Sequence, residues 1–599
     1  MTARVLAQRT VPLLAIGIAA ALLSFRPIYE PDLWWHLAQG REALSGHIVR
    51  TNLFSFTHPD YRQQFTPWLF DAVGYAAWRA AGGTGIQIVQ AGLLALTFGL
   101  LYGACRLRAS AWSAAAVLAI GFFILEPRAI PRPHLVSFAG VAACTFLIER
   151  ASAQRSARPL LWGVPLVGLW SNLHVECVFG VLLLAIYSCA EFVRPSALPR
   201  SEALRAVALA GICALATMAN PYGWGLVAYL YENLSVPGVL AIAELQPPYL
   251  PAYRAFYVYL LAGALLLALQ PRSLRLWEVL ALVVFAAAGA RYLRLTPLVL
   301  LTTAPMLAAR LTALSAWGID RRAILITASC AALAVSRVPV RMLITEVSVG
   351  TKAVAPPQFF SADAIAFIRE AGLEGPVFNS HNLGGYLALH FYPEVRIFQD
   401  SRLQAYPPEH FRGIMAASRD QSEWDRLVSD VDWAVLSSPR PNQLSGHGRF
   451  PPEEWSTVFR DDAVEILARK LPGARGQRPT PNGQLPTPNS QLPISNAQRP
   501  TPNGQRPTAN AQFPTSNSQL PTPNAQRPTA NAQCPTSNSQ RPMPNAQCPM
   551  PEATPKARGQ LPTLGLLVAL RWELGVGSGL TRSIAPYRDR NWGRHVERQ

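Results

Sequence analysis

The chain has 599 residues, of which 50% are hydrophobic and only 15% are charged, and its mean hydropathy is +0.16. Soluble domains carry about 25% charged residues, so this composition excludes a soluble cytoplasmic enzyme. The net charge of +18 does not indicate nucleic-acid binding, because the basic residues form short clusters between apolar runs, as in membrane-protein loops. The eight cysteines show no CxxC pair and no zinc-ligand spacing, so neither a disulfide scaffold nor a metal site is predicted.

Apolar runs that suit membrane helices follow one another along residues 1–340. A spanning helix needs about 20 mostly apolar residues, and fewer where it is buried in a bundle. The sequence therefore predicts a mainly α fold, a polytopic membrane helix bundle of about eleven spans. The predicted spans are residues 11–25, 86–105, 111–125, 134–149, 160–171, 174–193, 203–219, 254–270, 276–290, 292–311 and 322–336.

The arginines predict the orientation of this bundle, because cytoplasmic loops are rich in Lys and Arg. Fifteen arginines fall on the N-terminal segment and the alternate connections, against five on the opposite short connections. We therefore expect a cytoplasmic N-terminus in a bacterial cytoplasmic (inner) membrane, with residues 340–470 on the external, periplasmic side. The cytoplasmic connections contain little beyond Arg, Ser and Pro, so candidates for chemistry are expected at the external edge.

The first external loop, residues 26–85, contains the motif YEPDLWWHLAQG. Two acids, Glu30 and Asp32, precede a tryptophan pair, and aromatic residues with polar neighbours favour the headgroup layer. Residues 32–45 and 67–81 are predicted as two helices that lie in the interface. The loop would therefore hold carboxylates at the membrane surface.

A long external loop with acids after the first helix and two interfacial helices resembles the GT-C class of membrane glycosyltransferases, in particular bacterial relatives of the polyprenyl-phosphate-sugar-dependent protein mannosyltransferases. The chain also contains the strings EPDLWWHLAQG, TNLFSFT, PRPHLVSF, WSNLH, NPYG, ELQPP and GGYLALHFYPEVRIFQDSRLQAY. These strings resemble a branch of large bacterial membrane proteins affiliated with that class.

The resemblance covers about residues 10–470. It implies an acid after the first helix, a long external loop with two interfacial helices, a helix bundle and an external C-terminal domain. The chain departs from the doubled acidic motifs of better-known members, because its acids are Glu30 and Asp32 with Pro31 between them. Which acid is catalytic therefore stays open.

Asp32 is the first candidate for catalysis, and Glu30 is the second. A carboxylate can act as the general base that takes a proton from an acceptor hydroxyl. Asp32 also stands where a predicted helix starts and could cap its free N–H groups, and the two roles are compatible. Arg291 and Arg294 interrupt an apolar stretch, where charge is costly unless it is paired or hydrated. We interpret them as a clamp on the donor phosphate, with snorkelling to the interface as the alternative.

Other polar residues of the external edge are weaker candidates. Arg132 and His134 are assigned either to donor-phosphate binding or to a structural role. His174 and Glu176 resemble two metal ligands, but no third ligand follows, so a hydrogen-bonded turn is favoured and no metal is assigned. Glu244 could pair with one of the outer arginines. The candidate substrate-lining residues are His36, Asn172, His174 and Glu244.

Residues 351–470 have the composition of a soluble domain. A helix at Ser361–Gly372 and three short buried strands are predicted, an alternation typical of a small α/β domain. The strands are expected at residues 376–380, 395–400 and 433–438, and a further strand at residues 463–469 is left open. Asn382–Gly385 could bind an anion, although tight packing is favoured. Asp400 and Arg402 are expected either to pair or to contact the acceptor.

Residues 477–553 are eleven heptads, typified by QLPTPNS. They are rich in proline and show no recurring apolar face, so they cannot bury a core and are predicted to be disordered. The remaining segment, residues 554–599, is assigned no structure or role.

These observations together predict an inverting membrane glycosyltransferase. It would move a sugar from a polyprenyl-phosphate donor to a glycan, lipid or protein acceptor of the envelope, on the external face of the bilayer. No nucleic acid is expected as a partner and no cofactor is assigned, with the participation of a divalent cation left open. Two alternatives remain. A transporter or flippase of lipid-linked substrates predicts charges deep in the bundle, and a non-catalytic envelope-assembly protein predicts dispensable first-loop acids.

Overall fold

The computed structural model describes residues 3–235, 243–248, 253–270, 274–314, 361–437 and 448–470, with side chains described from residue 14 to 231 in the first range. The chain divides into two units, residues 1–490 and 491–599, and all described residues belong to the first unit. The predicted span at 322–336, the heptads at 477–553 and the segment 554–599 lie outside the described residues.

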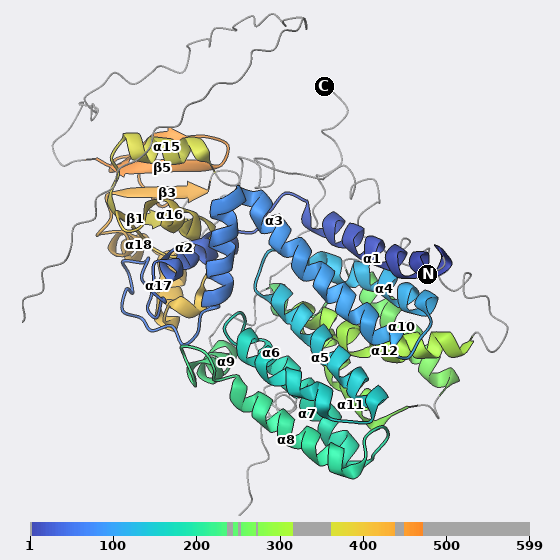
Figure 1. The fold of residues 1–599 in the computed structure, drawn as a ribbon. Coiled ribbons are helices and arrows are strands. Elements are labelled where there is room, and N and C mark those ends of the chain that lie inside the picture. Colours follow the sequence, from blue (N-terminus) through green and yellow to red (C-terminus); the bar gives the residue numbers. More distant parts are fainter. Residues whose placement is uncertain are drawn as a thin grey trace, which may run out of the picture. The chain divides into compact units, whose positions relative to one another are not determined.

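Helices make up most of the described chain up to residue 314 (Figure 1). The α-helices are α1 (Ala3–Ser24), α2 (Asp32–Leu44), α3 (Trp68–Arg106), α4 (Ala111–Leu125), α5 (His134–Gln154), α6 (Gly163–Trp170), α7 (Cys177–Val193), α8 (Arg200–Ala216), α9 (Gly225–Ser235), α10 (Arg254–Leu269), α11 (Leu276–Arg291) and α12 (Thr296–Leu314). Short 3-10 helices are η1 (Glu126–Arg128), η2 (Arg158–Trp162), η4 (Ala243–Leu245) and η6 (Leu293–Leu295). Each predicted apolar segment from 11–25 to 292–311 overlaps a helix.

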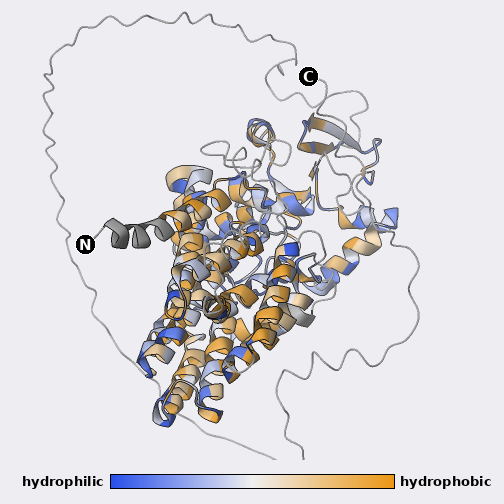
Figure 2. Cartoon of the chain, turned by 90° about the vertical axis from the view of Figure 1, so that its right-hand side faces the viewer, coloured by the Kyte–Doolittle hydropathy of each residue, from blue (hydrophilic) through white to orange (hydrophobic). Residues whose placement is uncertain are grey.

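Four helices in the described ranges are long and apolar enough to cross a membrane. They are Trp68–Arg106, Ala111–Arg128, His134–Gln154 and Leu293–Leu314. Hydrophobic residues extend along the helices of the bundle, and hydrophilic residues gather toward their ends (Figure 2). The chain is therefore an integral membrane protein of mainly α fold, while the number of eleven spans stays a prediction.

The first long loop contains the two predicted helices. One is α2, and the other is the first part of α3, which ends at a kink where Ala81 and Gly82 have non-helical backbone angles. Gly82 has a φ of +56°, a conformation that glycine adopts without the steric cost of a side chain. At Gly40 an added Cβ would lie 2.0 Å from the carbonyl oxygen of Asp71, so α2 packs closely on the first part of α3.

The predicted small α/β domain is present between residues 361 and 470. Its five strands are β1 (Gly375–Asn379), β2 (Val395–Ile397), β3 (Trp433–Ser437), β4 (Trp455–Arg460) and β5 (Val464–Arg469). The sheet order is β2-β1-β3-β5-β4; β1 is parallel to β2 and β3, and β5 is antiparallel to β3 and β4. The helices are α15 (Ala362–Glu370), α16 (Gly384–Phe391), α17 (Pro408–Ala417) and α18 (Gln421–Leu427).

Helix α16 joins this domain to the first loop. An added Cβ at Gly385 would lie 2.7 Å from the backbone nitrogen of Trp35 in α2, and one at Gly384 would lie 2.0 Å from the carbonyl oxygen of Gln399. Arg41 of α2 donates from Nη1 to the carbonyl oxygen of Leu389 at 2.8 Å. The glycine pair therefore serves tight packing, as the sequence favoured, and it places the sheet domain beside the first-loop acids.

Candidate functional site

Arg132 joins the two acids of the first loop. Its Nη2 lies 2.7 Å from Oε1 of Glu30 and 2.9 Å from Oδ2 of Asp32. Glu30 follows α1, whereas Arg132 lies two residues before the start of α5, so the fold brings together residues 102 positions apart. The predicted catalytic acids and one predicted phosphate-binding arginine thus form a single group.

Asp32 is the first residue of α2, but its side chain does not cap the helix. The cap residue is Pro31, which makes no side-chain hydrogen bond. The capping interpretation of Asp32 is therefore wrong, because its carboxylate is used elsewhere. Oδ1 accepts a hydrogen bond from the hydroxyl of Ser401 in the sheet domain. The Asp32 side chain remains 19% exposed, so solvent reaches it.

Glu244 of η4 extends this group. Its Oε1 accepts hydrogen bonds from Nη1 of Arg128 at 2.9 Å and from Nη1 of Arg132 at 3.0 Å. The predicted pairing of Glu244 with an outer arginine is confirmed. Burial opposes the charged carboxylate, but the two guanidinium groups outweigh it and lower the pKa of Glu244 to about 2. We call Glu30, Asp32, Arg128, Arg132 and Glu244 the first-loop cluster.

The two neighbouring acids of this cluster have different environments. Glu30 is only 6% exposed, and burial raises its pKa, opposed by the charge of Arg132 and reinforced by that of Asp32. Around Arg132 the carboxylates outweigh the opposing effect of burial and raise the pKa of the guanidinium. The cluster therefore keeps a permanent positive charge next to a partly exposed carboxylate.

The two arginines of the predicted clamp have different surroundings. Arg294 donates from Nη2 to Oε1 of Glu176 at 2.8 Å, and its charge also acts on Glu244. Arg291 is exposed, and its guanidinium lies 4.9 Å from the ring centre of Tyr292. Arg294 is therefore connected electrostatically to the first-loop cluster, whereas the described residues give Arg291 no ion pair.

His174 takes part in a hydrogen-bonded turn. Its Nδ1 lies 2.7 Å from Oγ of Ser137 and 3.5 Å from Oε2 of Glu176. Burial lowers the pKa of His174 to about 4, so its ring is neutral at pH 7. Across the residues that the structure describes, no group of three His, Cys, Asp or Glu side chains is placed to hold a metal ion.

Two other predicted residues hold local structure at the same end of the bundle. Oδ1 of Asn172 accepts a hydrogen bond from Nε1 of Trp68 at 3.0 Å, at the start of α3. Nε2 of His134 lies 2.7 Å from the carbonyl oxygen of Arg128. His134 thus supports the backbone of an arginine in the first-loop cluster.

His36 belongs to a buried pair that the sequence did not indicate. Its Nδ1 lies 2.6 Å from Oδ1 of Asp71, and both side chains are at most 5% exposed. Gln39, with its amide oriented to satisfy both neighbours, donates to Oδ2 of Asp71 at 3.0 Å and accepts from Nη1 of Arg402 at 2.9 Å. Burial, with added repulsion from Arg132, lowers the pKa of His36 well below its ordinary value. The pair links the first loop to the sheet domain.

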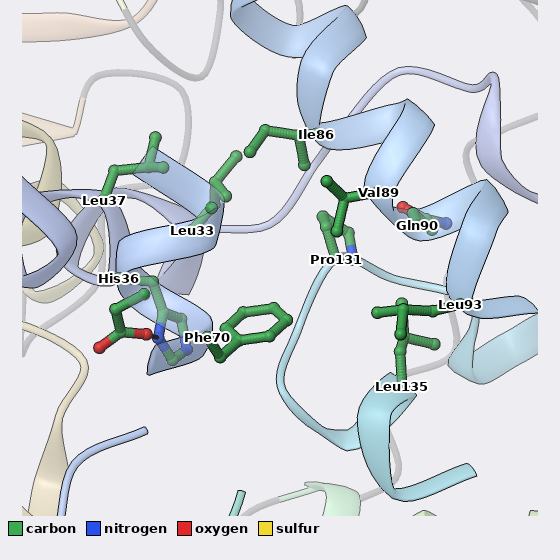
Figure 3. Close-up of a pocket in the computed structure, with 12 residues that line it drawn as sticks. Leu33, His36, Leu37, Phe70, Ile86, Val89, Gln90, Leu93, Pro131 and Leu135 are labelled. Carbon is green, nitrogen blue, oxygen red and sulfur yellow. Dashed lines mark hydrogen bonds and ion pairs between the residues drawn. The ribbon is translucent and has the colours of Figure 1, made fainter. Parts of the chain in front are cut away.

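His36 and Asp71 line a mainly apolar pocket (Figure 3). The pocket contains about 370 Å³ of empty space, including some that is open to solvent. Pro131, next to Arg132, forms part of its wall, so the pocket adjoins the first-loop cluster. Its lining residues are Leu33, His36, Leu37, Phe70, Asp71, Gly74, Ile86, Val89, Gln90, Leu93, Pro131 and Leu135.

A second arginine–carboxylate group lies at the other end of α5. Nη1 of Arg108 lies 3.0 Å from Oε1 of Glu149 and also contacts Glu278, and Nη2 of Arg310 lies 3.7 Å from Oε2 of Glu278. The expectation about Arg, Ser and Pro concerned the connections alone, and the two glutamates of this group lie outside them. Both glutamates are inside helices, where a search of the connections overlooks them. We call Arg108, Glu149, Glu278 and Arg310 the opposite-end cluster.

The comparisons with known proteins give partial matches. A family model described as the herpesvirus envelope glycoprotein GP350 C-terminal region matches residues 431–569, less than half of the chain. No curated protein matches. The oligosaccharyltransferase of Archaeoglobus fulgidus, tethered with an acceptor peptide, is similar with a TM-score of 0.48 and 14% identity, over 72% of this chain and 70% of that one.

ArnT from Cupriavidus metallidurans in the apo state is similar with a TM-score of 0.45 and 14% identity, over 77% of this chain and 97% of that one. Both structures are of GT-C glycosyltransferases. Likenesses of this size do not decide the function, so the functional argument depends on the site itself. The affiliation with the protein mannosyltransferase relatives stays a prediction.

Proposed function

We propose that this chain is a membrane glycosyltransferase that moves a sugar from a polyprenyl-phosphate donor to a hydroxyl acceptor at the external face of a bacterial inner membrane. The first-loop cluster carries the proposal, because its partly exposed carboxylate, Asp32, contacts a guanidinium group of the cluster and also a serine hydroxyl of the sheet domain. Asp32 is bonded to the Ser401 hydroxyl on one oxygen and to Arg132 on the other.

The chemistry follows from these contacts. Asp32 accepts the proton of the acceptor hydroxyl while the oxygen of that hydroxyl attacks the anomeric carbon of the donor sugar. The bond from that carbon to the phosphate oxygen breaks, and displacement from the opposite face inverts the anomeric configuration. The leaving phosphate gains charge, which Arg132 stabilises, with Arg128 and Arg294 nearby. Glu30 is the alternative base.

Glu244 marks where the donor phosphate would bind. Its carboxylate contacts Arg128 and Arg132, and the charge of Arg294 also acts on it. Guanidinium groups bind carboxylate and phosphate oxygens with the same geometry. This supports Arg132 and Arg294 as phosphate ligands more strongly than Arg291, which lies exposed over Tyr292.

The placement of charge favours a transferase over a transporter or flippase. Among the described bundle helices, the buried Asp, Glu and Arg side chains lie within two turns of a helix end, as Glu149, Glu278 and Arg310 do. A transport path would need ionisable groups near mid-membrane.

The proposal is tested with the purified full chain in detergent or liposomes and radiolabelled undecaprenyl-phosphate sugars, with and without a divalent cation. Release of undecaprenyl phosphate that requires Asp32 supports the transferase. A protein that is correctly inserted but releases none from any such donor favours the non-catalytic alternative. Reporter fusions after Arg108 and after Pro356 should place these positions on cytoplasmic and external sides, respectively.

A further inference from the structure

The segment Asp400–Arg402 presents a serine hydroxyl rigidly. Nε of Arg402 lies 2.9 Å from Oδ2 of Asp400, and Nη2 lies 2.6 Å from the same oxygen. The backbone nitrogen of Arg402 donates to Oδ1 of Asp400 at 2.9 Å, and that of Asp400 donates to the Tyr406 hydroxyl at 3.0 Å. Asp400 and Arg402 are both completely buried, so the residue between them is held by a fork-shaped ion pair.

Ser401 is that residue, and it is partly exposed. Its hydroxyl donates a hydrogen bond to Oδ1 of Asp32, the carboxylate that we propose as the general base. The other oxygen of Asp32 contacts Arg132, which we propose as a phosphate ligand. Ser401, as the nucleophile, therefore contacts the proposed base Asp32, and Asp32 in turn contacts Arg132, the proposed ligand of the leaving phosphate.

We propose that Ser401 is a modification site, which accepts a sugar from the lipid-linked donor by transfer within the same chain. This inference rests on the proposed function. In the step, Asp32 takes the proton of the Ser401 hydroxyl, and a bond forms between Oγ and the anomeric carbon. The bond between that carbon and the phosphate oxygen breaks, polyprenyl phosphate leaves, and Asp32 later returns the proton to solvent.

The intramolecular position of the hydroxyl favours this acceptor. Well-oriented groups within one molecule react as if present at about 10⁵–10⁸ M. Once a donor sugar reaches Asp32, the fixed Ser401 hydroxyl meets it at a far higher effective concentration than a dissolved acceptor.

The chain contains a matched control. Ser422 lies in the same domain, and its hydroxyl also donates to an aspartate, Oδ1 of Asp420, at 2.6 Å. Trypsin would release Ser401 in the peptide IFQDSR (residues 397–402) and Ser422 in the peptide DQSEWDR (residues 420–426), each with a single hydroxyl side chain. The two peptides therefore differ in whether their serine faces the proposed base.

The experiment incubates the purified full chain with undecaprenyl phosphate mannose or undecaprenyl phosphate glucose, and measures both peptides by mass spectrometry. We expect one hexose on 397–402 and none on 420–426. Ser401→Thr should retain the hexose because it keeps a hydroxyl, whereas Ser401→Ala and Asp32→Asn should lose it. The Thr variant also shows that a changed residue 401 does not itself abolish folding.

The outcomes separate this inference from the proposed function. If undecaprenyl phosphate is released but 397–402 stays unmodified, the self-modification is wrong and the transferase stands. A hexose that persists in Asp32→Asn, or that appears equally on 420–426, also overturns it. If no donor is consumed by the intact chain, the proposed function fails and the modification fails with it.

Discussion

The two arginine–carboxylate clusters occupy opposite ends of α5 and differ in exposure. The first-loop cluster is partly open, with Asp32 19% and Arg132 23% exposed. In the opposite-end cluster, Glu149 is 1% exposed and the Glu278 side chain is completely buried. Helix α5 has 21 residues, so about 31 Å of helix separates its two ends at about 1.5 Å per residue. Similar ion pairs therefore lie partly open at one end of α5 and largely closed at the other.

The difference in exposure follows from which parts of the chain supply the ion-pair partners in each cluster. Around Glu278 they come from helix ends, since Arg108 follows α3, Arg310 belongs to α12, and the backbone nitrogen of Arg275 at the start of α11 donates to Oε2 at 3.2 Å. Around Arg132 they come from the loop before α2, from the first residue of α2 and from the short 3-10 helix η4. The cluster around Glu278 therefore joins the ends of long bundle helices, whereas the cluster around Arg132 joins the first loop to short segments and stays partly exposed.

Asp32→Asn is the variant with the largest expected effect, and it tests whether the first-loop cluster takes part in catalysis. The change keeps the size of the side chain but removes the base, and loss of a general base commonly lowers the rate by about 10²–10⁴. Donor binding should be largely retained because the arginines remain. Sugar transfer and donor binding are measured on the purified full chain. If Glu30→Gln abolishes transfer while Asp32→Asn does not, the base is Glu30.

The opposite-end cluster should respond in stability instead. Glu278→Ala leaves the buried Arg310 and the partly buried Arg108 without this carboxylate, and breaking a buried pair costs about 3–5 kcal/mol. We expect a markedly lower thermal unfolding temperature in detergent. Glu423→Ala removes an exposed ion pair with Arg426 and should leave that temperature unchanged. Equal effects of the two changes would show that the opposite-end cluster is not a structural junction.

The sequence predicted local features better than long-range pairs. The helices at 32–45 and 67–81 follow from their polar and aromatic pattern, and α2 and the first part of α3 confirm them. The edge strand β4 was missed because its residues mostly face solvent and show no buried alternation. Pairings across the fold, such as Glu30 with Arg132 and His36 with Asp71, depend on helix packing that no local spacing encodes.

The acids of the first-loop cluster can be distinguished by pH. Glu244 has a pKa of about 2 in the folded chain against an ordinary value of 4.5. Its contribution to stability is therefore present above pH 4.5 and is lost as the pH falls toward 2. The full difference corresponds to about 3 kcal/mol, of which about 2 kcal/mol is lost between pH 6 and pH 3. The difference in unfolding free energy between the unchanged chain and Glu244→Gln should therefore decrease by about 2 kcal/mol when the pH is lowered from 6 to 3.

The stability contribution of Glu30 should change with pH in the opposite direction to that of Glu244. Its pKa is raised in the folded chain, so its contribution is present below its ordinary pKa and is lost as the pH rises through the raised value. Glu30→Gln should therefore gain stability relative to the unchanged chain as the pH rises. Both are measured as unfolding midpoints over a pH series. The same sign for both variants would contradict the environments described for the two acids.

The smallest expected effect compares the two arginines of the predicted clamp. Arg294→Ala removes a guanidinium that is paired with Glu176 and acts on Glu244, and hydrogen bonds to charged groups contribute about 1.5–3 kcal/mol. We expect donor binding to weaken by about 10–150-fold, measured with undecaprenyl-phosphate sugars. Arg291→Ala should weaken it much less, because Arg291 lies exposed over Tyr292. Transfer should fall with binding in Arg294→Ala, since its charge also stabilises the leaving phosphate. A larger loss in Arg291→Ala would place the phosphate at the exposed end of α11 and away from the first-loop cluster.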